Sequence, residues 1–326
     1  MTRAVSGHGH PFRPDNRLVA LPIVLDCDPG HDDAIALLLA LGSDELVLRG
    51  VTTVAGNQTL EKTTANALRV LDLAGRTDVP VAAGAAEPLE RELVVAAHVH
   101  GESGLDGPTL PAPSVAPVPT DAVAWIASTV ERAGRPVALV PTGPLTNVAR
   151  YLERHGTDGI AQIVVMGGAI AEGNMTPAAE FNIWADPEAA AVVFAADVDV
   201  TMIGLDVTHQ AVTRPEVQRR LAATGRIGTF VADLVEFFTV YHRETYGWDG
   251  APIHDAVAVA HLIRPDLVTT RLRNVEVELA SELCRGRTVV DLWLRTDRPK
   301  NVRVGVELDT TGFFDLLVER IARLEG

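Results

Sequence analysis

Lysine is almost missing from this chain of 326 residues, since Lys62 and Lys300 are its only two lysines. Neither lies in a motif, so Schiff-base chemistry and lysine-assisted phosphate binding have no obvious residue. The patterns GxGxxG, GxxxxGK(S/T) and GxSxG are also absent. These absences argue against a dinucleotide-binding fingerprint, a phosphate-binding loop and the nucleophile elbow of the α/β-hydrolases.

Basic residues are also few: the chain has 28 Lys and Arg but 43 Asp and Glu, which gives a formal net charge of −15. Phosphate contacts need clustered Lys and Arg, so this balance argues against nucleic acid as a partner. Cysteine is scarce too, and Cys27 and Cys284 provide no disulfide framework. We therefore expect a reduced, cytoplasmic setting.

The N-terminal region offers neither a membrane span nor a targeting signal. The apolar stretch 18–25 is too short for a span and runs straight into Asp26 without a small-residue cleavage site. We therefore predict neither a membrane anchor nor a signal peptide. Residues 1–20 are polar and hold Gly and Pro, so we expect a frayed tail there and assign no function to His8 and His10.

Apolar residues are plentiful, at 47% of the chain against 22% charged residues. This composition is typical of a globular protein with a large core. Short apolar, β-branched runs alternate with longer helical patterns through most of the sequence. The runs that predict strands are 21–25, 46–55, 80–84, 136–141, 162–168 and 198–207. The patterns that predict helices are 33–41, 59–75, 120–134, 145–156 and 186–197.

The end of the chain changes character and predicts two paired strands, a further strand and a final helix, at 274–280, 287–294, 301–308 and 311–324. Continuous apolar strands alternating with helices are typical of a parallel sheet covered on both faces. The sequence thus predicts an open, mostly parallel but mixed α/β sheet of the Rossmann-like type. The Pro-rich segment 106–120 is interpreted as a loop inside one domain, 21–326, because the alternation resumes beyond it.

In an open parallel sheet, the ligand site lies beyond the carboxyl ends of the strands. The candidates for function are therefore the segments directly after predicted strands, namely DCDPGHDD, AGNQT, PTGPLTN, GGAIAEGN and LDVTH. In the first of these, four acids crowd at the end of a buried strand: Asp26, Asp28, Asp32 and Asp33. Carboxylates placed in this way repel one another and lose hydration, so something must compensate.

A hard divalent cation would provide this compensation, because several carboxylate oxygens together favour Ca²⁺ or Mg²⁺. The absence of Cys and His at zinc-ligand spacing argues against Zn²⁺. Capping of the following helix by Asp32 or Asp33 is the alternative, and it accounts for one carboxylate at most. We therefore favour a metal site at this strand end.

Three other clusters have both a functional and a structural interpretation. Taken alone, His254 and Asp255 at the start of an apolar helix are explained as a surface residue and an N-cap. The Gly-rich stretch 98–107 is either a mobile lid or a simple loop. A third cluster suits a polyhydroxylated ligand, although a turn can contain the same residues. Its members are Asn174, Glu180, Phe181 and Asn182.

Together, these motifs resemble the signature of the inosine–uridine-preferring nucleoside hydrolase family. The resemblance begins with DCDPGHDDA and continues in the family's usual order through TTVAGNQT, HVHGESGLDGP, LVPTGPLTN, VVMGGA, EGNMTPAAEFNIWADPEAA, GLDVTH and HDAVAVAHL. It spans nearly the whole chain, from about Ile23 to Leu324. One such motif is weak evidence, whereas the ordered set is strong. The family's open, mostly parallel α/β sheet agrees with the fold predicted from the pattern alone.

The resemblance implies one Ca²⁺ at the bottom of the site, held by Asp28, Asp33, Asp255 and the backbone carbonyl of Thr142. The 2′- and 3′-hydroxyls of the substrate and one water would complete the coordination. Asp28 would also act as general base toward that water. The positions that match the family's ribose-binding residues are Asp32, Asn57, Asn174, Glu180 and Asn182.

His254 matches the family's leaving-group histidine, while His100 and Phe181 match residues that line the pocket near the base and the sugar. The resemblance also suggests a segment that closes over the base, containing Tyr241, Tyr246 and Trp248. Family members accept different residues between the Gly and the Asp pair, so His31 is interpreted as incidental. Asp26 is interpreted as a structural partner at the strand end.

The implied reaction is Ca²⁺-dependent hydrolysis of the N-glycosidic bond of a free ribonucleoside, which yields ribose and a nucleobase. Positive charge builds on the ribose in an oxocarbenium-like transition state, and a carboxylate-rich pocket stabilises that charge. The proposed metal contact to the 2′-hydroxyl favours ribonucleosides over deoxyribonucleosides, while the loops permit either purine or pyrimidine bases. Family members are commonly homodimers or homotetramers, and we expect one of these states.

Two other functions fit parts of the sequence. A phosphatase of the haloacid dehalogenase type also carries Asp-x-Asp at a strand end. Here, however, Gly30 replaces the expected Thr or Val, and no suitably placed Lys follows. A catalytically silent nucleoside or sugar sensor would keep the same fold and the Ca²⁺. No observation supports the sensor, because every expected acid is present.

Overall fold

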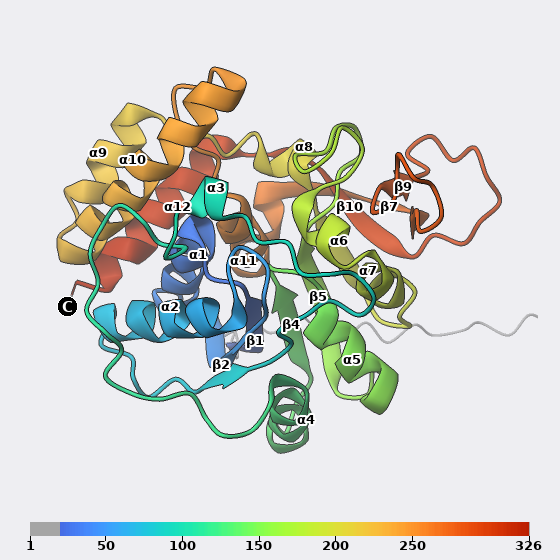
Figure 1. Cartoon of the computed structure of the whole chain (residues 1–326), viewed down its shortest axis with the longest axis horizontal. Coiled ribbons are helices and arrows are strands. Elements are labelled where there is room, and N and C mark those ends of the chain that lie inside the picture. Colours follow the sequence, from blue (N-terminus) through green and yellow to red (C-terminus); the bar gives the residue numbers. More distant parts are fainter. Residues whose placement is uncertain (1–19, 326) are drawn as a thin grey trace, which may run out of the picture.

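Residues 20–325 are described by the structure, which is a computed structural model of the chain. They form a layered α/β fold in which helices lie on both faces of a central sheet (Figure 1). The predicted Rossmann-like α/β class is confirmed. The tail predicted for residues 1–20, with His8 and His10, lies outside the described residues except for Ala20.

The central sheet has eight strands: β1 (Leu21–Cys27), β2 (Leu46–Thr53), β3 (Val81–Ala83), β4 (Val137–Pro141), β5 (Ile160–Met166), β6 (Val200–Ile203), β7 (Val268–Arg273) and β10 (Val302–Leu308). Their spatial order is β3-β2-β1-β4-β5-β6-β10-β7. Every neighbouring pair is parallel except β10 and β7, which run antiparallel. The order reverses at β1, which lies between β2 and β4, and such a switch point is where open α/β sheets bind ligands.

Helices connect and cover the strands. They are α1 (His31–Leu41), α2 (Leu60–Leu73), α3 (Ala97–His100), α4 (Ala122–Arg132), α5 (Thr146–His155), α6 (Phe181–Ala185), α7 (Pro187–Phe194), α8 (Leu205–Thr208), α9 (Pro215–Ala222), α10 (Arg226–Tyr246), α11 (His254–Ile263) and α12 (Thr310–Arg323). Local signals set several boundaries. The Asp121 side chain accepts the N–H groups of Val123 and Ala124 at the start of α4, and Gly75, at φ +65°, follows the end of α2.

The C-terminal part contains one confirmed prediction and one omission. The predicted strand pair forms a separate two-stranded antiparallel sheet of β8 (Val275–Val277) and β9 (Thr288–Val290). Sequence reasoning missed β7, whose side chains are mostly exposed or half-buried, so it lacks the continuous apolar run of a central strand. It also made no prediction for α9 and α10, of which α10 carries one wall of the site described below.

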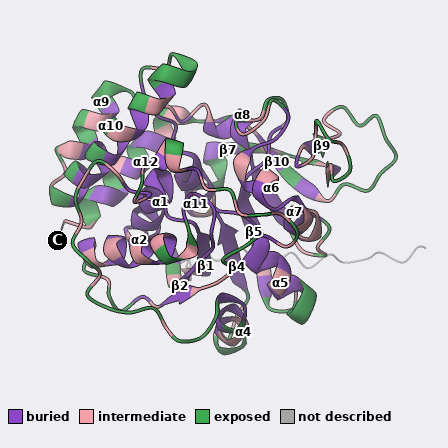
Figure 2. Ribbon diagram, in the orientation of Figure 1, coloured by how far each residue is buried: buried purple, intermediate pink, exposed green. Residues whose placement is uncertain are grey.

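Two apolar clusters, one on each face of the sheet, hold the layers together. Within β1, Ile23 and Leu25 pack into the cluster that includes α1, α10, α11 and α12, and Val24 packs into the cluster of α4, α5 and α7. The strand is therefore buried on both sides, as Figure 2 shows for the interior of the molecule. This double burial fixes the position of the acids that follow β1.

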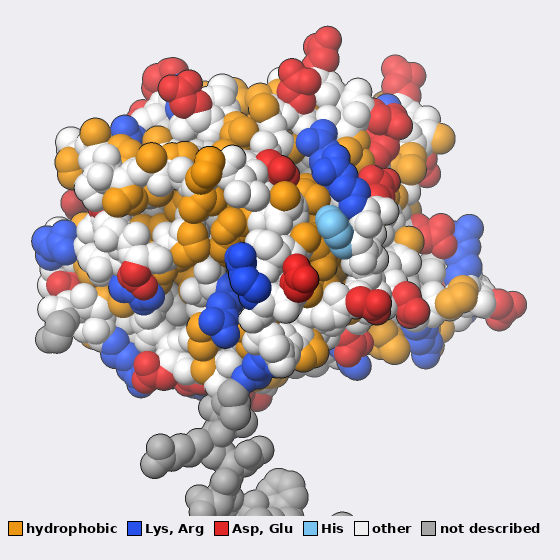
Figure 3. Space-filling model, turned by 90° about the horizontal axis from the view of Figure 1, so that it is seen from below, with side chains coloured by type: hydrophobic (Ala, Val, Ile, Leu, Met, Phe, Trp, Pro, Cys, Tyr) orange, Lys and Arg blue, Asp and Glu red, His pale blue; other side chains and the backbone are white. Residues whose placement is uncertain are grey.

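Helix hydropathy and the charge pattern of one face can be compared with the sequence composition for the described residues. Between residues 20 and 325, no helix is both long and apolar enough to cross a membrane. On the face seen in Figure 3, Lys and Arg side chains are interspersed with acidic and apolar ones instead of forming one continuous basic surface. That distribution agrees with the acidic net charge.

Candidate active site

A cleft that is partly open to solvent lies at the carboxyl ends of the parallel strands, and its empty space, open solvent included, is about 720 Å³. The segments after β1, β2 and β4 all contribute to it, as the parallel-sheet rule predicts. The predicted site residues that line the cleft are Asp32, Asn57, His100, Thr142, Asn174, Glu180, Phe181, Asn182, His254 and Asp255.

The other two predicted residues, Asp28 and Asp33, are fully buried and connect to the cleft through Asn57. The backbone N–H of Asn57 donates to Asp28 Oδ2 at 2.6 Å. Its side-chain amide donates to Asp33 Oδ2 at 3.1 Å and to the Asp28 carbonyl at 3.1 Å. The structure thus brings all twelve predicted residues to one place.

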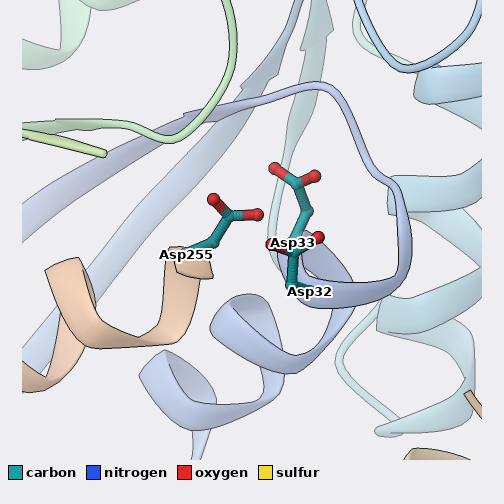
Figure 4. Close-up of side chains that lie close together, drawn as sticks. All are labelled: Asp32, Asp33 and Asp255. Atoms are coloured by element: carbon teal, nitrogen blue, oxygen red, sulfur yellow. The ribbon is translucent and has the colours of Figure 1, made fainter. Parts of the chain in front are cut away.

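Three carboxyl groups converge from two helices (Figure 4). Asp32 and Asp33 lie in the first turn of α1, and Asp255 lies in the first turn of α11 and points toward them. One oxygen from each side chain lies within 4.8 Å of the others. The short Pro29–Gly30 connection places the α1 acids directly after β1, where the helix N-terminus favours negative charge.

Burial and mutual repulsion raise the pKa values of these acids. The pKa of Asp32 rises to about 7, first through burial and then through the negative charge of Asp33. Burial and the negative charge of Asp33 hold the pKa of Asp28 well above the usual range, and burial and the negative charge of Asp32 do the same for the pKa of Asp255. Without a compensating positive charge, the ionised cluster is unfavourable.

Asp28 supplies the observation that best fits a cation. Its Oδ1 is buried without a hydrogen-bond partner, whereas Oδ2 accepts the Asn57 N–H. Gly56 and Gly143 flank the carboxyl group so closely that a Cβ on either would overlap its oxygens. An unpaired buried carboxylate oxygen is costly. The donor set, made of oxygens only, therefore fits a hard divalent cation.

Thr142 and Asn182 connect this acidic cluster to the sheet. The Thr142 hydroxyl donates to Asp33 Oδ1 at 2.9 Å. The Asn182 amide donates to the carbonyls of Thr142 at 2.7 Å and Met166 at 3.1 Å, joining the ends of β4 and β5. A carbonyl oxygen has two lone pairs, so Thr142 keeps one position for a further partner.

The remaining predicted sugar-binding residues are fixed by hydrogen bonds to the backbone. The Glu180 side chain accepts three backbone N–H groups, those of Gly168, Asn182 and Ile183. Burial nevertheless raises the pKa of Glu180 to about 7. Asn174 Oδ1 accepts the N–H of Phe181 at 2.9 Å. These side chains are therefore oriented before a ligand arrives.

His254 begins α11 and is buried, although it lines the cleft. Its Nδ1 lies 2.7 Å from the Thr208 hydroxyl at the end of α8. Burial lowers the pKa of His254 well below its usual range, which favours the uncharged imidazole before a ligand binds. An uncharged ring can donate one N–H toward the cleft when Thr208 donates to the other nitrogen.

Helix α10 supplies a wall of the cleft that sequence reasoning only partly found. Tyr241 and Tyr246 line the cleft, and Trp248 stacks on Tyr246 with ring centroids 4.8 Å apart. Phe238 and His242 also line it and were missed. Their spacing of four residues, continued at Tyr246, places them on one face of a helix and was the available signal. His98 and His209 line the cleft as well and lie in segments predicted as candidates, the stretch 98–107 and LDVTH, without having been assigned a role. The other lining residues that were missed are Ala96, Val99, Met166 and Met175.

Asp26 takes no part in the cleft, in agreement with its interpretation as a structural residue. Its Oδ1 accepts hydrogen bonds from the Thr52 hydroxyl at 2.5 Å and the Asn147 amide at 2.8 Å. It thereby links β1 to β2 and α5. Burial raises the pKa of Asp26 to about 6, although these two hydrogen bonds lower it.

Comparison with known proteins agrees with this geometry. The profile of the inosine-uridine preferring nucleoside hydrolases matches residues 23–315. The pyrimidine-specific ribonucleoside hydrolase RihA of Citrobacter koseri is 52% identical over 308 residues, which cover 93% of this chain and 99% of that protein. RihA of Salmonella typhimurium is also 52% identical, over 307 residues, with the same coverage.

Solved structures show the same fold. A purine-preferring ribonucleoside hydrolase from Gardnerella vaginalis superposes with a TM-score of 0.87 at 35% identity, covering 93% of this chain and 98% of that one. A plant nucleoside hydrolase superposes with a TM-score of 0.85 at 34% identity, covering 93% and 99%. These relatives hydrolyse nucleosides, which argues against the phosphatase alternative. The chain belongs to the inosine–uridine-preferring nucleoside hydrolase family and is a hydrolase of the ribonucleoside N-glycosidic bond.

Proposed function

We propose that this enzyme cleaves free ribonucleosides into ribose and a nucleobase in a Ca²⁺-dependent reaction. The observation that carries this proposal is the group of four buried carboxyl groups beside a cleft lined by amides, imidazoles and aromatic rings. Carboxylates suit both a hard cation and the positive charge that develops on the ribose. Aromatic rings suit the planar base.

The residues proposed to hold the ion are Asp28, Asp33, Asp255 and Thr142 through its carbonyl. The unpaired Asp28 Oδ1, the convergence of Asp33 and Asp255, and the second lone pair of the Thr142 carbonyl support this set. Oxygen donors favour Ca²⁺ or Mg²⁺, and the resemblance to the family favours Ca²⁺. When bound, Ca²⁺ would supply positive charge that orients the ribose diol and a water and eases deprotonation of that water.

Asp28 is proposed as the general base that removes a proton from the attacking water. Its Oδ2 is held by the N–H of Asn57, whereas Oδ1 has no partner among the described residues. An oxygen with two lone pairs can face the ion with one and accept the proton with the other. Because the carboxyl group is wedged between Gly56 and Gly143, it does not have to be reoriented for this step.

The ribose is proposed to bind to Asp32, Asn57, Asn174, Glu180 and Asn182, with His100 and Phe181 near the base and the sugar. All seven line one cleft. Several are already fixed by hydrogen bonds, so binding requires little reorganisation of the protein. Carboxyl groups at this position stabilise an oxocarbenium-like transition state more than the neutral substrate.

His254 is proposed to assist departure of the base by donating a hydrogen bond or proton to it. We expect His254→Ala to lower kcat for natural nucleosides by about 10²- to 10⁴-fold, the usual contribution of general acid catalysis. A 4-nitrophenyl riboside has a good leaving group and should lose far less activity. Steady-state kinetics on both substrates measure the difference.

Thr208→Val provides a second variant in which His254 is retained but loses the hydroxyl 2.7 Å from Nδ1. Thr208→Val should also lose more kcat on the natural nucleoside than on the nitrophenyl riboside, but the difference should be smaller than for His254→Ala. Equal losses on the nucleoside and the nitrophenyl riboside would show that His254 does not act on the leaving group.

The base is proposed to be a pyrimidine, because relatives that share 52% of their residues with this chain are pyrimidine-specific. The purine-preferring relative of known structure shares only 35%. In a panel of uridine, cytidine, inosine and adenosine, we expect the pyrimidine nucleosides to have kcat/KM values at least about 10-fold higher, equivalent to about 1.4 kcal/mol.

Release of reducing sugar from each nucleoside of the panel is the measurement, and 2′-deoxyuridine is the control for the ribose contacts. A preference for inosine or adenosine would contradict the pyrimidine assignment. No ribose from any ribonucleoside would contradict the proposed function and support a silent sensor.

The remaining proposals concern assembly and location. We propose one domain from residue 21 onward, a homodimer or homotetramer, and a cytoplasmic enzyme. Cys27 and Cys284 are both free, which agrees with a reducing setting. Light scattering coupled to gel filtration distinguishes a monomer from the two proposed oligomers.

A further inference from the structure

His31, interpreted from the sequence as incidental, belongs to a buried chain of contacts that reaches the cleft. It is the first residue of α1 and is fully buried. Its Nε2 lies 2.8 Å from the backbone carbonyl of Asp106, and its Nδ1 lies 3.0 Å from Nδ1 of His100. Its ring stacks on Phe237 and Phe238, with interplanar angles of 3° and 5°. Both ring nitrogens of His31 therefore have defined partners.

The partners decide where the hydrogens lie. A carbonyl oxygen only accepts, so the Asp106 contact places a hydrogen on Nε2 of His31. A second hydrogen on Nδ1 would bury a cationic ring among aromatic side chains, without a carboxylate hydrogen-bonded to it in the described part of the chain. Nδ1 of His31 therefore carries a lone pair.

A hydrogen bond between the two rings then requires the hydrogen to be on His100, and without it two lone pairs would face each other 3.0 Å apart. The backbone N–H of His31 also points at Nδ1 of His100, at 3.3 Å. Only one of the two contacts can be a hydrogen bond, since Nδ1 cannot donate and accept at once. The Nδ1–H form of His100 keeps the shorter contact, between the rings, and gives up the longer one, in which the backbone N–H of His31 would be the donor.

The opposite nitrogen of His100 acquires a function from this arrangement. Nδ1 and Cε1 of His100 face Gly30 and His31, and His100 lines the cleft. In a neutral imidazole with hydrogen on Nδ1, Nε2 is an acceptor. We propose that His31 is a positioning residue that holds His100 in its Nδ1–H tautomer, so that Nε2 accepts a hydrogen bond from the bound nucleoside.

This inference rests on the proposed function only for the identity of the ligand. A nucleoside offers suitable donors in its ribose hydroxyls and in the N–H groups of its base. If the tautomer were reversed, Nε2 could no longer accept a hydrogen bond. An N–H of the base would then face a second donor, and a ribose hydroxyl would have to turn and accept instead of donate. His31 would thus influence the reaction without touching the substrate.

The test compares His31→Leu with His31→Asn in the full-length enzyme. Leucine and asparagine have similar sizes, but only Asn keeps an acceptor, Oδ1, for the Nδ1–H of His100. We expect His31→Leu to lower kcat/KM by about 10- to 100-fold, comparable to removal of a group that orients a metal-bound imidazole. His31→Asn should recover most of that loss.

A matched control removes a stacked histidine elsewhere. His155 stacks on Tyr151 with ring centroids 5.3 Å apart and lies outside the cleft, so His155→Leu should leave kcat/KM unchanged. If His31→Leu and His31→Asn lose activity equally, the acceptor at position 31 is irrelevant and the proposal is overturned.

Nitrogen-15 NMR of histidine-labelled enzyme measures the tautomer directly and needs no substrate. His100→Gln identifies the resonances of that ring. The expected result is hydrogen on Nδ1 of His100 in the wild type and in His31→Asn, and loss of this preference in His31→Leu. A wild-type His100 with hydrogen on Nε2 would overturn the proposal even in a fully active enzyme.

A double variant separates positioning from packing. Because His31 acts through His100, adding His31→Leu to His100→Gln should cost little further activity. A full additional loss would show that His31 only packs, against the proposal. If the proposed function is wrong, the wild-type enzyme will cleave no nucleoside. The NMR measurement of the His100 tautomer does not depend on activity, so it tests the present proposal separately.

Discussion

Replacement of Asp28 by asparagine is expected to remove most of the hydrolytic activity and to leave the fold intact. Asparagine keeps the shape of the side chain and can still accept the N–H of Asn57. It cannot take a proton from water, and it offers a cation a neutral ligand. Since general base catalysis alone contributes about 10²- to 10⁴-fold, we expect kcat to fall by about 10³-fold or more.

The measurement is kcat at saturating nucleoside, with circular dichroism and thermal unfolding as checks on the fold. Asp26→Asn is the matched control, because Asp26 lies two residues earlier on β1 and its carboxyl group bonds to Thr52 and Asn147 outside the cleft. It should affect Tm more than kcat. The assignment of Asp28 would be refuted by near-normal turnover of Asp28→Asn, or by an equal loss in the control.

The layers of the fold could be predicted because their signals are local. A continuous apolar run predicts β1 at 21–25, and the structure extends it by two residues to Cys27. The Asp121 side chain caps the start of α4 and Gly75 follows the end of α2, and both residue types favour such helix ends. The position of the site could also be predicted, because the carboxyl ends of parallel strands meet at one edge of the sheet.

What the residues alone could not provide depends on contacts between distant parts of the chain. His254 and Asp255 look like an ordinary helix start until α11 is seen packed beside α1, which brings Asp255 to Asp32. Only the resemblance to a family assigned them in advance. His31 and His100 are 69 residues apart, so no local pattern predicts that their rings meet.

Removal of divalent cations should abolish activity and also destabilise the protein, more strongly at pH 8 than at pH 5. In the metal-free chain, burial raises the folded-state pKa of Asp32 from 3.8 to about 7 and holds those of Asp28 and Asp255 well above the usual range. A carboxyl group with a raised folded-state pKa contributes stability that is fully present below pH 3.8. That contribution is lost as the pH rises through the folded-state pKa, which for Asp32 is about 7.

Ca²⁺ binding should restore the stability lost at high pH, because the ion prefers the ionised carboxylates, whereas protons compete with it at low pH. At a free concentration about 100 times Kd, binding contributes about 2.7 kcal/mol.

Thermal unfolding in EDTA, Ca²⁺ and Mg²⁺ at both pH values measures this contribution. The variant Asp255→Asn, which has one ligand fewer, should reduce it. A Ca²⁺-induced rise in Tm that is as large at pH 5 as at pH 8, or unchanged in Asp255→Asn, would place the cation away from the acidic cluster. Ca²⁺ and Mg²⁺ could also stabilise the protein equally while only one of them restores hydrolysis. In that case the acidic cluster binds both ions, and the requirement for one of them arises in the reaction and not in binding.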